Sequence, residues 1–404
     1  MIYKILSSVI EKYKQEIEDW FLNKFLLCYP SVLNSSVDLR SSGYKIAPID
    51  TNVFPAGYNN FNTQSKNYAA ALLREYLLKY NNCKKILIIA EEHTRNLKYI
   101  DNIIALRDIV NIAGFDVAVG MCNIDCDVQI YSSTKKILDV KCIVNQRGVV
   151  KTNCGFTSDL ILVNNDMTSG IPDVLQNLLN QYVMPSLQLG WFKRRKSRHF
   201  SIYEAISLEF CKEFGIDHWL ICALFASCEN ICFLSNKGIE NIANGVDNLI
   251  SKIKEKFLLY SIKEQPYVFV KANNGTYGMG VITAYGGDDI LNLNKRGRNK
   301  IQKIKGNTVV NSVLIQEGIL TIDKFNGYVS EPLIYYIGKD PVCYLYRYNI
   351  KKNMLSNLNS SGCNFIDVGY QICEEKKKIW CLVSKLAVLS ATMEMYELEN
   401  MITR

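Results

Sequence analysis

One short stretch, residues 267–281, restricts the fold of this chain more than any other part of the sequence, because an apolar strand pattern leads directly into a glycine-rich turn. Residues 268–270 are β-branched or aromatic, which is typical of a buried strand. Lys271 ends this strand as a compact cation. The turn that follows carries three glycines: Gly275, Gly278 and Gly280. Glycine permits positive φ and close backbone approach, so the N–H groups of such a turn can converge on phosphate oxygens.

The spacing of these glycines distinguishes the turn from other phosphate-binding loops. G-x-x-G-x-G is neither the G-x-x-x-x-G-K-[ST] of a P-loop nor the G-x-G-x-x-G of a Rossmann or protein-kinase loop. The turn resembles instead the nucleotide lid of ATP-grasp proteins. Contacts with the nucleotide are then predicted for Lys271, Gly275, Thr276, Tyr277, Gly278 and Gly280. The alternative is an ordinary glycine-bearing hairpin with an edge lysine.

Bulk composition places the chain among globular proteins. With 404 residues, 48% of them hydrophobic, it can bury a large core, and two or three lobes are expected. No run approaches the ~20 apolar residues of a membrane helix. Residues 1–27 alternate apolar and charged side chains as an amphipathic helix does, rather than a signal peptide. We therefore expect a cytoplasmic protein whose fourteen cysteines are free thiols.

The net charge of +8 is modest for this length, and its densest part is the run Lys193–Arg198. Nucleic-acid binding is one explanation of such a run, but neither a recognisable binding fold nor a wider basic stripe accompanies it. A tight cluster equally suits small anions such as phosphate or a carboxylate. A helix is expected just after the run, at 201–214, and its N-terminal dipole would add to the attraction. We therefore expect no nucleic-acid partner.

Strand and helix patterns alternate in the first part of the chain. Strands are expected at 85–90, 115–119 and 160–163, and a helix at 99–112. This alternation is typical of an α/β layer with a mostly parallel sheet, whose strand ends are where ligands bind. Two polar segments, Glu91–Asn96 and Asn164–Gly170, follow the first and third of these strands.

The later segments complete a predicted division into four regions. Further helices are expected at 171–182, 201–214, 239–260, 289–304 and 379–399, and further strands at 281–285, 313–319, 328–337 and 342–350. The regions are an N-terminal α/β lobe at 1–165, a central helical and substrate region at 166–238, a lid at 239–316 and a C-terminal subdomain at 317–404. No internal repeat or low-complexity linker separates them, which favours lobes that pack together.

A second nucleotide-binding element is expected at the strand end 316–319. Backbone amide and carbonyl groups at such a strand end can bind the adenine edge, and a carboxylate there can accept hydrogen bonds from the ribose hydroxyls. We expect Gln316, Glu317 and Ile319 to contribute, with Glu317 on the ribose. The alternative is a surface glutamate at a strand terminus.

A metal-binding end is expected further along the chain. Mg²⁺ prefers an octahedron of oxygens and takes one or two protein ligands together with phosphate oxygens. Asn357 and Asn359, at i and i+2 on one face of an expected strand, offer two amide oxygens, and Glu331 offers a carboxylate. Arg347 could bind a γ-phosphate or an acyl phosphate bidentately. Taken singly, each is more typical of a solvated side chain, but their order along the chain favours a site.

The segment 38–60 concentrates hydrogen-bonding groups among rigid proline and glycine positions. A rigid segment with many polar groups is suited to bind a zwitterion. The groups expected to bind an ammonium are Asp38, Asp50, Asn52 and Asn59, with Asn60 beside them, and those expected to bind a carboxylate are Arg40 and Lys45. The alternative is a structural loop that joins two lobes.

Together these motifs resemble the glutamate-cysteine ligase family of proteobacterial type over nearly the whole chain. The specific part is Asp-x-Arg at 38–40 with Pro-x-Asp-Thr-Asn-x-Phe-Pro-x-Gly-x-Asn-Asn at 48–60; further matches lie at 92–96, 164–166, 190–200 and 357–362. The resemblance implies an α/β (α+β) chain with an ATP-grasp fold and an N-terminal α/β substrate-binding lobe. ATP and Mg²⁺ are the implied cofactors. The implied reaction joins the γ-carboxyl of L-glutamate to the amine of L-cysteine through γ-glutamyl phosphate, which is the first step of glutathione biosynthesis.

The resemblance also implies further site residues. The matched motifs add His93, Arg95, Asn96, Asn165 and Asp166 to the substrate-binding set. The basic residues expected to face the transferred phosphate or the glutamate α-carboxylate are Arg194, Arg195 and Lys196. A second nucleotide-binding lysine is expected before the lid, and Lys196 and Lys237 are both candidates.

The chain departs from the family pattern at one place. An acidic residue is expected just ahead of the Asn-Leu-Asn motif, where this chain has Met354-Leu-Ser356, so Glu331 becomes a more necessary metal ligand. Two other functions stay open: a different ATP-grasp carboxylate-amine ligase, similar to glutathione synthetase, or a nucleotide-binding or nucleic-acid-binding module without catalysis. No membrane partner is expected, and the sequence is compatible with a homo-oligomer.

Overall fold

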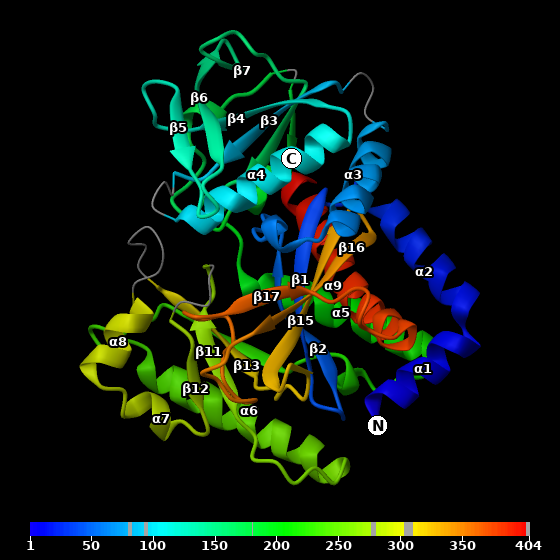
Figure 1. The fold of residues 1–404 in the computed structure, drawn as a ribbon. Coiled ribbons are helices and arrows are strands. Elements are labelled where there is room, and N and C mark those ends of the chain that lie inside the picture. The colour runs from blue at the N-terminus through cyan, green and yellow to red at the C-terminus, as the bar shows by residue number, and fades with distance from the viewer. Residues whose placement is uncertain (80–82, 93–95, 180, 276–279, 303–309, 401–404) are drawn as a thin grey trace.

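The computed structural model describes residues 1–79, 83–92, 96–179, 181–275, 280–302 and 310–400. Their strands form three sheets. A seven-stranded sheet lies at the top of Figure 1, a six-stranded sheet in the middle and a four-stranded sheet at the lower left. The middle sheet therefore lies between the other two sheets, so residues on it can contribute to cavities on either side.

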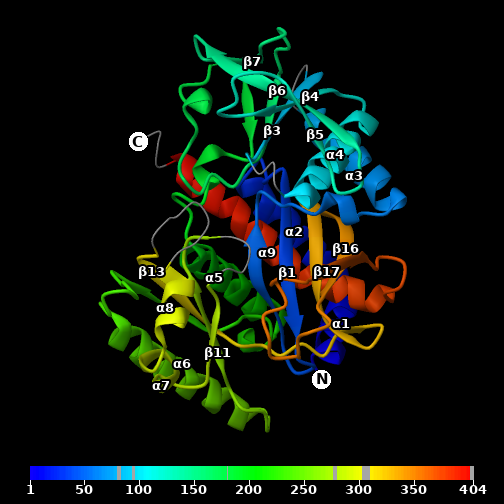
Figure 2. The ribbon, with the colours of Figure 1, turned by 60° about the vertical axis from the view of Figure 1, so that its left-hand side comes forward.

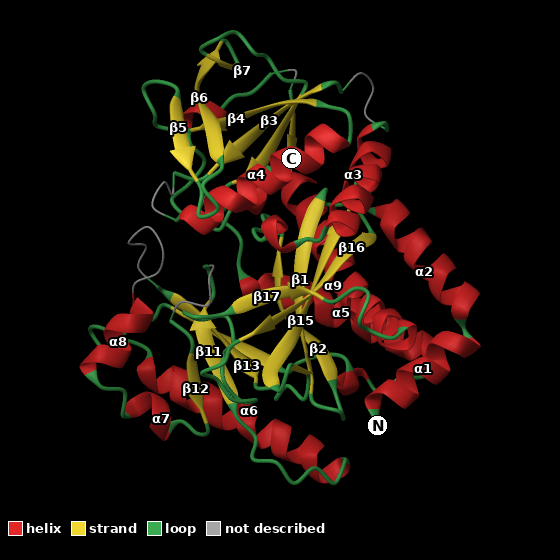
Figure 3. Ribbon diagram, viewed as in Figure 1, coloured by secondary structure: helices red, strands yellow, loops and turns green. Residues whose placement is uncertain are grey.

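The seven-stranded sheet belongs to the N-terminal half of the chain, and its strand order is β5-β6-β4-β3-β8-β9, with β7 paired to β6. The strands are β3 (Lys85–Ala90), β4 (Asp116–Met121), β5 (Val128–Tyr131), β6 (Ile137–Gln146), β7 (Val149–Thr152), β8 (Leu160–Asn164) and β9 (Tyr182–Met184). β3, β4 and β8 run parallel. β3 and β8 are almost wholly apolar, as parallel strands covered on both faces require. Helix α4 (Leu97–Ile112) packs on β3 and β4, and α3 (Thr63–Leu77) packs on α4 (Figure 3).

The six-stranded middle sheet joins the two ends of the chain, in the order β17-β16-β15-β1-β2 with β14 paired to β15. Its strands are β1 (Asn34–Ser41), β2 (Ile46–Asn52), β14 (Lys324–Phe325), β15 (Tyr328–Ile337), β16 (Asp340–Tyr348) and β17 (Asn364–Asp367). Figure 2 shows α9 (Glu374–Asn400) crossing behind β1. The other helices around α9 are α1 (Ile2–Lys12), α2 (Lys14–Leu27) and α5 (Lys196–Phe214).

The four-stranded sheet has the order β10-β13-β11-β12 and is antiparallel. Its strands are β10 (Phe225–Glu229), β11 (Val268–Ala272), β12 (Ile282–Ala284) and β13 (Ser312–Glu317). Helix α6 (Ile239–Leu259) covers it with an apolar stripe at i, i+3, i+4 and i+7 spacing. The remaining elements are α7 (Asp288–Leu291), α8 (Lys295–Gln302) and the 3-10 turns η1 (Tyr58–Asn60), η2 (Asp173–Leu175), η3 (Leu187–Leu189) and η4 (His218–Leu220).

Several sequence-based expectations are confirmed. The chain is an α/β protein, with a parallel core in the N-terminal sheet. The expected strands at 85–90 and 160–163, the hairpin of β15 and β16, and the long helices at 239–260 and 379–399 are all present within a few residues. These elements carry the strongest periodic patterns, which is why sequence alone locates them.

Other expectations are wrong. Residues 171–182 hold η2 and the start of β9 rather than a helix, since Pro172 fixes the entry and Asn177 adopts a positive φ of 52°. The helix expected to begin at Ser201 begins at Lys196, so part of the basic run forms its first turn. The helix expected at 289–304 is divided into α7 and α8. The alternative that the segment 38–60 is a structural loop does not hold for its first part, because residues 38–41 and 46–52 lie in β1 and β2.

Helix α9 is long and apolar enough to cross a membrane, but 78% of its most apolar window is buried inside the structure. It is therefore a core helix. All fourteen cysteines are free, as expected from composition.

Candidate active site

β1 and β2 pair irregularly at the centre of the site. Asp38 faces Asp50 across the two strands, and the register then shifts, so that Ile49 has no partner on β1. A bulge of this kind leaves backbone groups outside the hydrogen-bonded ladder. The carbonyl of Ile49 instead accepts a hydrogen bond from Nζ of Lys271 at 2.7 Å. The bulge thereby joins the N-terminal hairpin to the lysine that precedes the glycine turn.

An acid–base cluster lies buried on β1, β15 and β16. Nη1 of Arg347 is 2.9 Å from Asp38 and 2.7 Å from Glu331. Nε of Arg40 is 2.8 Å from the other carboxylate oxygen of Glu331, and both of these side chains are 1% exposed. Burial acts to raise the pKa of Glu331, but the two guanidinium groups outweigh it and lower that pKa. For Asp38, burial outweighs the attraction of Arg347 and raises the pKa to about 6.

Two lysines approach the cluster from other elements. Lys271, on β11, also donates to Oε1 of Gln316 at 2.7 Å. Lys196, in the first turn of α5, forms a salt bridge with Asp50. Burial lowers the pKa of Lys271 to about 7, and the nearby carboxylate of Asp50 opposes this only in part. Burial acts to raise the pKa of Asp50, but the ammonium groups of the two lysines lower it.

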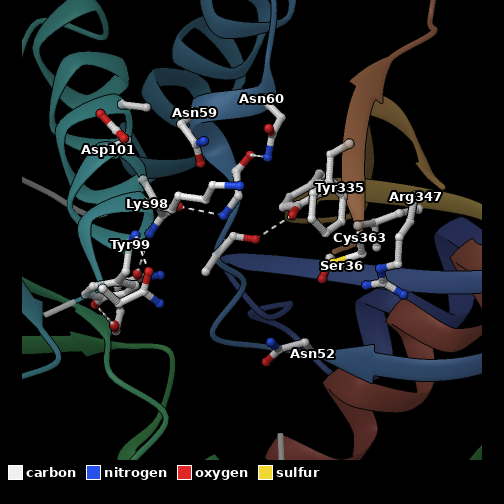
Figure 4. A pocket seen from close by; sticks show the side chains of 18 of the residues that line it. Ser36, Asn52, Asn59, Asn60, Lys98, Tyr99, Asp101, Tyr335, Arg347 and Cys363 are labelled. Atoms are coloured by element: carbon white, nitrogen blue, oxygen red, sulfur yellow. Dashed lines mark hydrogen bonds between the residues drawn. The ribbon is translucent and has the colours of Figure 1, made fainter. Parts of the chain in front are cut away.

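Two cavities meet at this cluster. The larger, of about 640 Å³, lies between the middle sheet and the N-terminal lobe, and the smaller, of about 60 Å³, lies between the middle sheet and the four-stranded sheet. The residues that line both cavities are Asp38, Asp50, Arg347 and Asn359. Figure 4 shows the larger cavity, with Arg347 and Asn52 on one side and Lys98 and Asp101 of α4 on the opposite side. Asp38 and Arg347 of the acid–base cluster thus belong to the wall that the two cavities share.

The chain after β2 forms a firmly held wall of the larger cavity. The hydroxyl of Tyr335 donates to the carbonyl of Ala56 at 2.6 Å, and the N–H of Gly57 donates to Oδ1 of Asn102 at 2.7 Å. Gly57 has a φ of +118°, and a Cβ at this position would lie 2.5 Å from the Tyr335 hydroxyl. Only glycine therefore lets the chain pass this close to β15.

Many of the residues predicted from sequence do line these cavities. In the larger cavity they are Asp38, Asp50, Asn52, Asn59, Asn60, Asn96 and Asp166, together with Arg347. In the smaller cavity they are Lys196, Lys271, Gly275, Gln316, Glu331, Asn357 and Asn359. Of the two candidate lysines ahead of the lid, Lys196 lines the smaller cavity, whereas Lys237 is exposed and lines neither. His93, Arg95, Thr276, Tyr277 and Gly278 lie outside the described residues.

Arg194 does not face the cavities, contrary to the expectation that it contacts the transferred phosphate. Its Nε and Nη2 atoms each lie 3.0 Å from Glu394 of α9, and its Nη1 donates to the carbonyl of Thr51 at 2.8 Å. Burial acts to raise the pKa of Glu394, but Arg194 lowers it to about 2. Arg194 thus ties β2 to α9. Nη1 of Arg195 donates to the main-chain carbonyls of residues 192–194, and its side chain lines neither cavity.

Lys45, expected to bind a substrate carboxylate, is instead paired with Glu317 at the end of β13. Its Nζ lies 2.5 Å from Glu317, and neither side chain is more than 1% exposed. The same carboxylate oxygen accepts the N–H of Leu224 at 2.8 Å. Arg40 is likewise neutralised by Glu331 and lines only the smaller cavity. Besides Arg194, Arg195 and Lys237, the predicted and described residues that line neither cavity are Lys45, Asn165, Gly280, Glu317 and Ile319.

Asn357 and Asn359 line the smaller cavity, but the prediction that they share one face of a strand is wrong. They lie in the loop between β16 and β17. Oδ1 of Asn357 accepts a hydrogen bond from the N–H of Asn359 at 3.0 Å. Asparagine side chains often bond to the backbone two residues on, which produces a turn and not an extended strand.

Sequence analysis missed the helical wall of the larger cavity. α4 contributes Lys98, Asp101, Asn102 and Asp108, and α3 contributes Lys66. The four α4 residues are spaced i, i+3, i+4 and i+10, so they form a polar stripe along one side of the helix. That stripe is the signal that could have located this wall.

Two comparisons with known proteins give matches over nearly the whole chain. The family model described as glutamate-cysteine ligase matches residues 7–395. A crystal structure from Methylobacillus flagellatus, named as a gamma-glutamylcysteine synthetase, is 32% identical with a TM-score of 0.89, and the match covers 97% of this chain and 96% of that one. A comparison with curated protein sequences gives no significant match.

Two other solved structures show weaker likeness. D-alanyl-alanine synthetase A from Vibrio cholerae is 11% identical with a TM-score of 0.34, over 78% of this chain and 81% of that one. A glutathione synthetase-like effector from Globodera pallida is 9% identical with a TM-score of 0.35, over 91% and 79%. At these scores neither likeness bears on function.

The fold and the family match define this chain as an α/β ATP-dependent ligase. The family model matches nearly the whole chain, and the matched range includes every described residue that lines the two cavities. The chain belongs to the glutamate-cysteine ligase family.

Proposed function

We propose that this chain joins the γ-carboxyl of L-glutamate to the amine of L-cysteine, with ATP converted to ADP and phosphate. The observation that carries the proposal is the wall shared by the two cavities. Lysines and the start of the glycine turn lie on one side of it, and amide and carboxylate groups lie on the other. A phosphoryl group could therefore pass from a nucleotide to an amino acid across this wall.

The reaction needs two displacements, because a carboxylate is a poor electrophile. In the first, a γ-carboxylate oxygen of glutamate attacks the γ-phosphorus of ATP, and the bond to the bridging oxygen breaks so that ADP leaves. In the second, the neutral amine of cysteine attacks the acyl carbon of γ-glutamyl phosphate, the bond to the phosphate oxygen breaks, and the amine releases a proton. The first step depends mainly on positioning and charge neutralisation.

Under this proposal the nucleotide binds around the smaller cavity, in an ATP-grasp arrangement. Lys196 and Lys271 would bind the phosphates, with the N–H groups of the glycine turn, and the hinge at 316–319 would hold the adenine. At about 60 Å³ the cavity is smaller than the roughly 300–1,000 Å³ of typical ligand sites. We therefore propose that the four-stranded sheet moves away from the middle sheet when ATP binds. Lys271 would then exchange its bonds to Ile49 and Gln316 for phosphate oxygens.

The amino-acid end is the larger cavity. Its hydrogen-bonding groups, Asn52, Asn59, Asn60, Asn96 and Asp166, support binding of the ammonium and carboxylate groups of the substrates. Because Arg40, Lys45 and Arg194 are each neutralised by a buried carboxylate, a substrate carboxylate needs another cation. Lys66 and Lys98 on the helical wall are placed to supply it.

Mg²⁺ is the divalent cation that we propose to accompany ATP, since it bridges phosphate oxygens and neutralises their charge during phosphoryl transfer. Carboxylate and amide oxygens are the ligands that it prefers, and both kinds line the smaller cavity. We also propose a reducing, cytoplasmic location, because all fourteen cysteines are free.

An ADP-release assay tests the proposal. ADP formation is measured with L-glutamate alone, L-cysteine alone and both together, and the product is identified by mass spectrometry. We expect ADP and γ-glutamylcysteine to form in equal amounts only when both amino acids are present. Turnover with γ-glutamylcysteine and glycine, but not with glutamate and cysteine, would favour a glutathione-synthetase-like ligase instead. Salt-dependent binding of nucleic acid without ATP turnover would favour a binding module.

A further inference from the structure

Asp38 and Asp50 present two carboxylates on one face of the middle sheet. They lie directly opposite each other on β1 and β2, and the Cβ atoms of such pairs are about 4.5–5.5 Å apart. Both residues line both cavities. An ion held between them would thus lie at the junction of the nucleotide end and the amino-acid end.

Each of these carboxylates keeps one oxygen outside the salt bridges of the cluster. Oδ2 of Asp38 is 2.9 Å from Arg347, whereas Oδ1 is buried and has no hydrogen-bond partner among the described residues. Asp38 is only 7% exposed, so an oxygen left without a partner there carries a desolvation cost. In Asp50, Oδ1 contacts Lys196, which leaves Oδ2 outside that contact. A ligand at this point would give the buried oxygen of Asp38 a partner.

Glu331 and Asn357, two of the metal ligands predicted from sequence, already have partners for the oxygens that would bind a metal. Both oxygens of Glu331 contact guanidinium groups, at 2.8 Å from Arg40 and 2.7 Å from Arg347. Oδ1 of Asn357 already accepts the N–H of Asn359. No group of three His, Cys, Asp or Glu side chains suited to a metal is found in the described parts of the chain. Two carboxylates nevertheless suffice for Mg²⁺, because phosphate and water oxygens complete its coordination.

We propose that Asp38 and Asp50 hold the divalent cation that accompanies ATP, through Oδ1 of the first and Oδ2 of the second. The cation would compensate the buried charge of Asp38. It would also explain how the chain can lack an acidic residue ahead of the Asn-Leu-Asn loop, because the N-terminal hairpin supplies the carboxylates. This inference rests on the proposed function, since the cation enters with the nucleotide.

Mn²⁺ is the probe for the test, because it favours the same oxygen ligands as Mg²⁺ and is paramagnetic. Its Kd is measured by electron paramagnetic resonance in the presence of ADP for the wild type, Asp38→Asn and Asp50→Asn. We expect each substitution to raise the Kd at least ten-fold. Asp101→Asn is the matched control, since it removes a carboxylate from the opposite wall of the larger cavity. Its Kd is expected to equal that of the wild type.

Circular dichroism and the thermal midpoint show whether each variant is folded. If Asp38→Asn does not fold, Asp38→Glu tests the same claim, because it keeps the charge while moving the oxygens, and the spectrum of bound Mn²⁺ is expected to change. The assignment is overturned if folded Asp38→Asn and Asp50→Asn bind Mn²⁺ like the wild type, or if only Glu331→Gln or Asn357→Ala weakens binding. Failure of the wild type to bind Mn²⁺ with ADP would instead contradict the proposed function itself.

Discussion

Nζ of Lys271 lies 2.7 Å from the main-chain carbonyl of Ile49. This hydrogen bond crosses from the four-stranded sheet to the bulge of β2, one residue before Asp50. If Lys271 leaves this carbonyl for a phosphate, as proposed, the strand that carries Asp50 and Asn52 loses one contact with the four-stranded sheet. The two cavities are therefore connected through the backbone of β2, which carries residues of both.

The first prediction concerns Lys271→Met, which removes the ammonium but keeps the length of the side chain. If this cation neutralises charge on the transferred phosphoryl group, its loss should reduce kcat/KM for ATP by about 10²–10³-fold. Steady-state ADP release, with circular dichroism to verify the fold, measures the effect. Wild-type activity in this variant would remove Lys271 from its proposed role.

The second prediction concerns pH and stability. Burial lowers the pKa of Lys271 from 10.5 to about 7 in the folded chain. Between these values the unfolded chain holds a proton that the folded chain has lost, so the free energy of unfolding should rise with pH across this window. Lys271→Met should lack this contribution, which for one proton is at most about 1.4 kcal/mol per pH unit.

Urea unfolding at several pH values from 6 to 10 checks this sign. The wild type should gain stability relative to Lys271→Met as the pH rises, and shifts of other groups cancel in the difference. A difference that stays constant, or that changes in favour of the variant, would show that the ammonium of Lys271 is not desolvated.

The third prediction separates two neighbouring arginines. Arg194→Met should lower the free energy of unfolding by about 3–5 kcal/mol, because it leaves Glu394 buried without its partner. Arg195→Ala should change it by no more than about 0.5 kcal/mol, since its guanidinium contacts only nearby carbonyls. Chemical denaturation compares the two. Equal effects would contradict the structural role of Arg194.

The fourth prediction concerns the wall of the larger cavity. Gly57→Ala introduces a Cβ that would lie 2.5 Å from the Tyr335 hydroxyl, at a φ of +118°. We expect it to destabilise the fold by about 1–3 kcal/mol more than Gly155→Ala does. Gly155 also has a positive φ, of +87°, but a Cβ there meets no atom within 4 Å. Equal thermal midpoints for the two variants would mean that the wall can shift without cost.

Much of the fold could be predicted from local pattern. The parallel strands β3 and β8 are short apolar runs, and α6 carries a regular apolar stripe. All three elements can therefore be located without knowing which distant residues they contact. The phosphate-binding role expected of Lys271 also follows from local sequence, because a strand leads directly into glycines. Its contact with β2, at the edge of the smaller cavity, does not, because that contact depends on the bulge at Ile49.

The roles of individual charged residues were harder to predict. Arg40 and Lys45 appeared free to bind a substrate carboxylate, yet their partners lie 291 and 272 positions away along the chain. The partner of Arg194 lies 200 positions away. A pattern within one segment cannot show that a distant carboxylate already neutralises a cation. Sequence therefore predicted many of the residues that line the two cavities but assigned several of the cations to the wrong contacts.

If the proposed function holds, glutamate is activated as γ-glutamyl phosphate before cysteine attacks. Transfer of ¹⁸O from L-glutamate labelled in its γ-carboxylate tests this most directly, with the inorganic phosphate analysed by mass spectrometry after reaction with ATP and L-cysteine. Each phosphate released should carry one oxygen from the glutamate carboxylate, in equal amount to γ-glutamylcysteine. Phosphate without ¹⁸O, alongside ADP formation, would rule out γ-glutamyl phosphate as the intermediate.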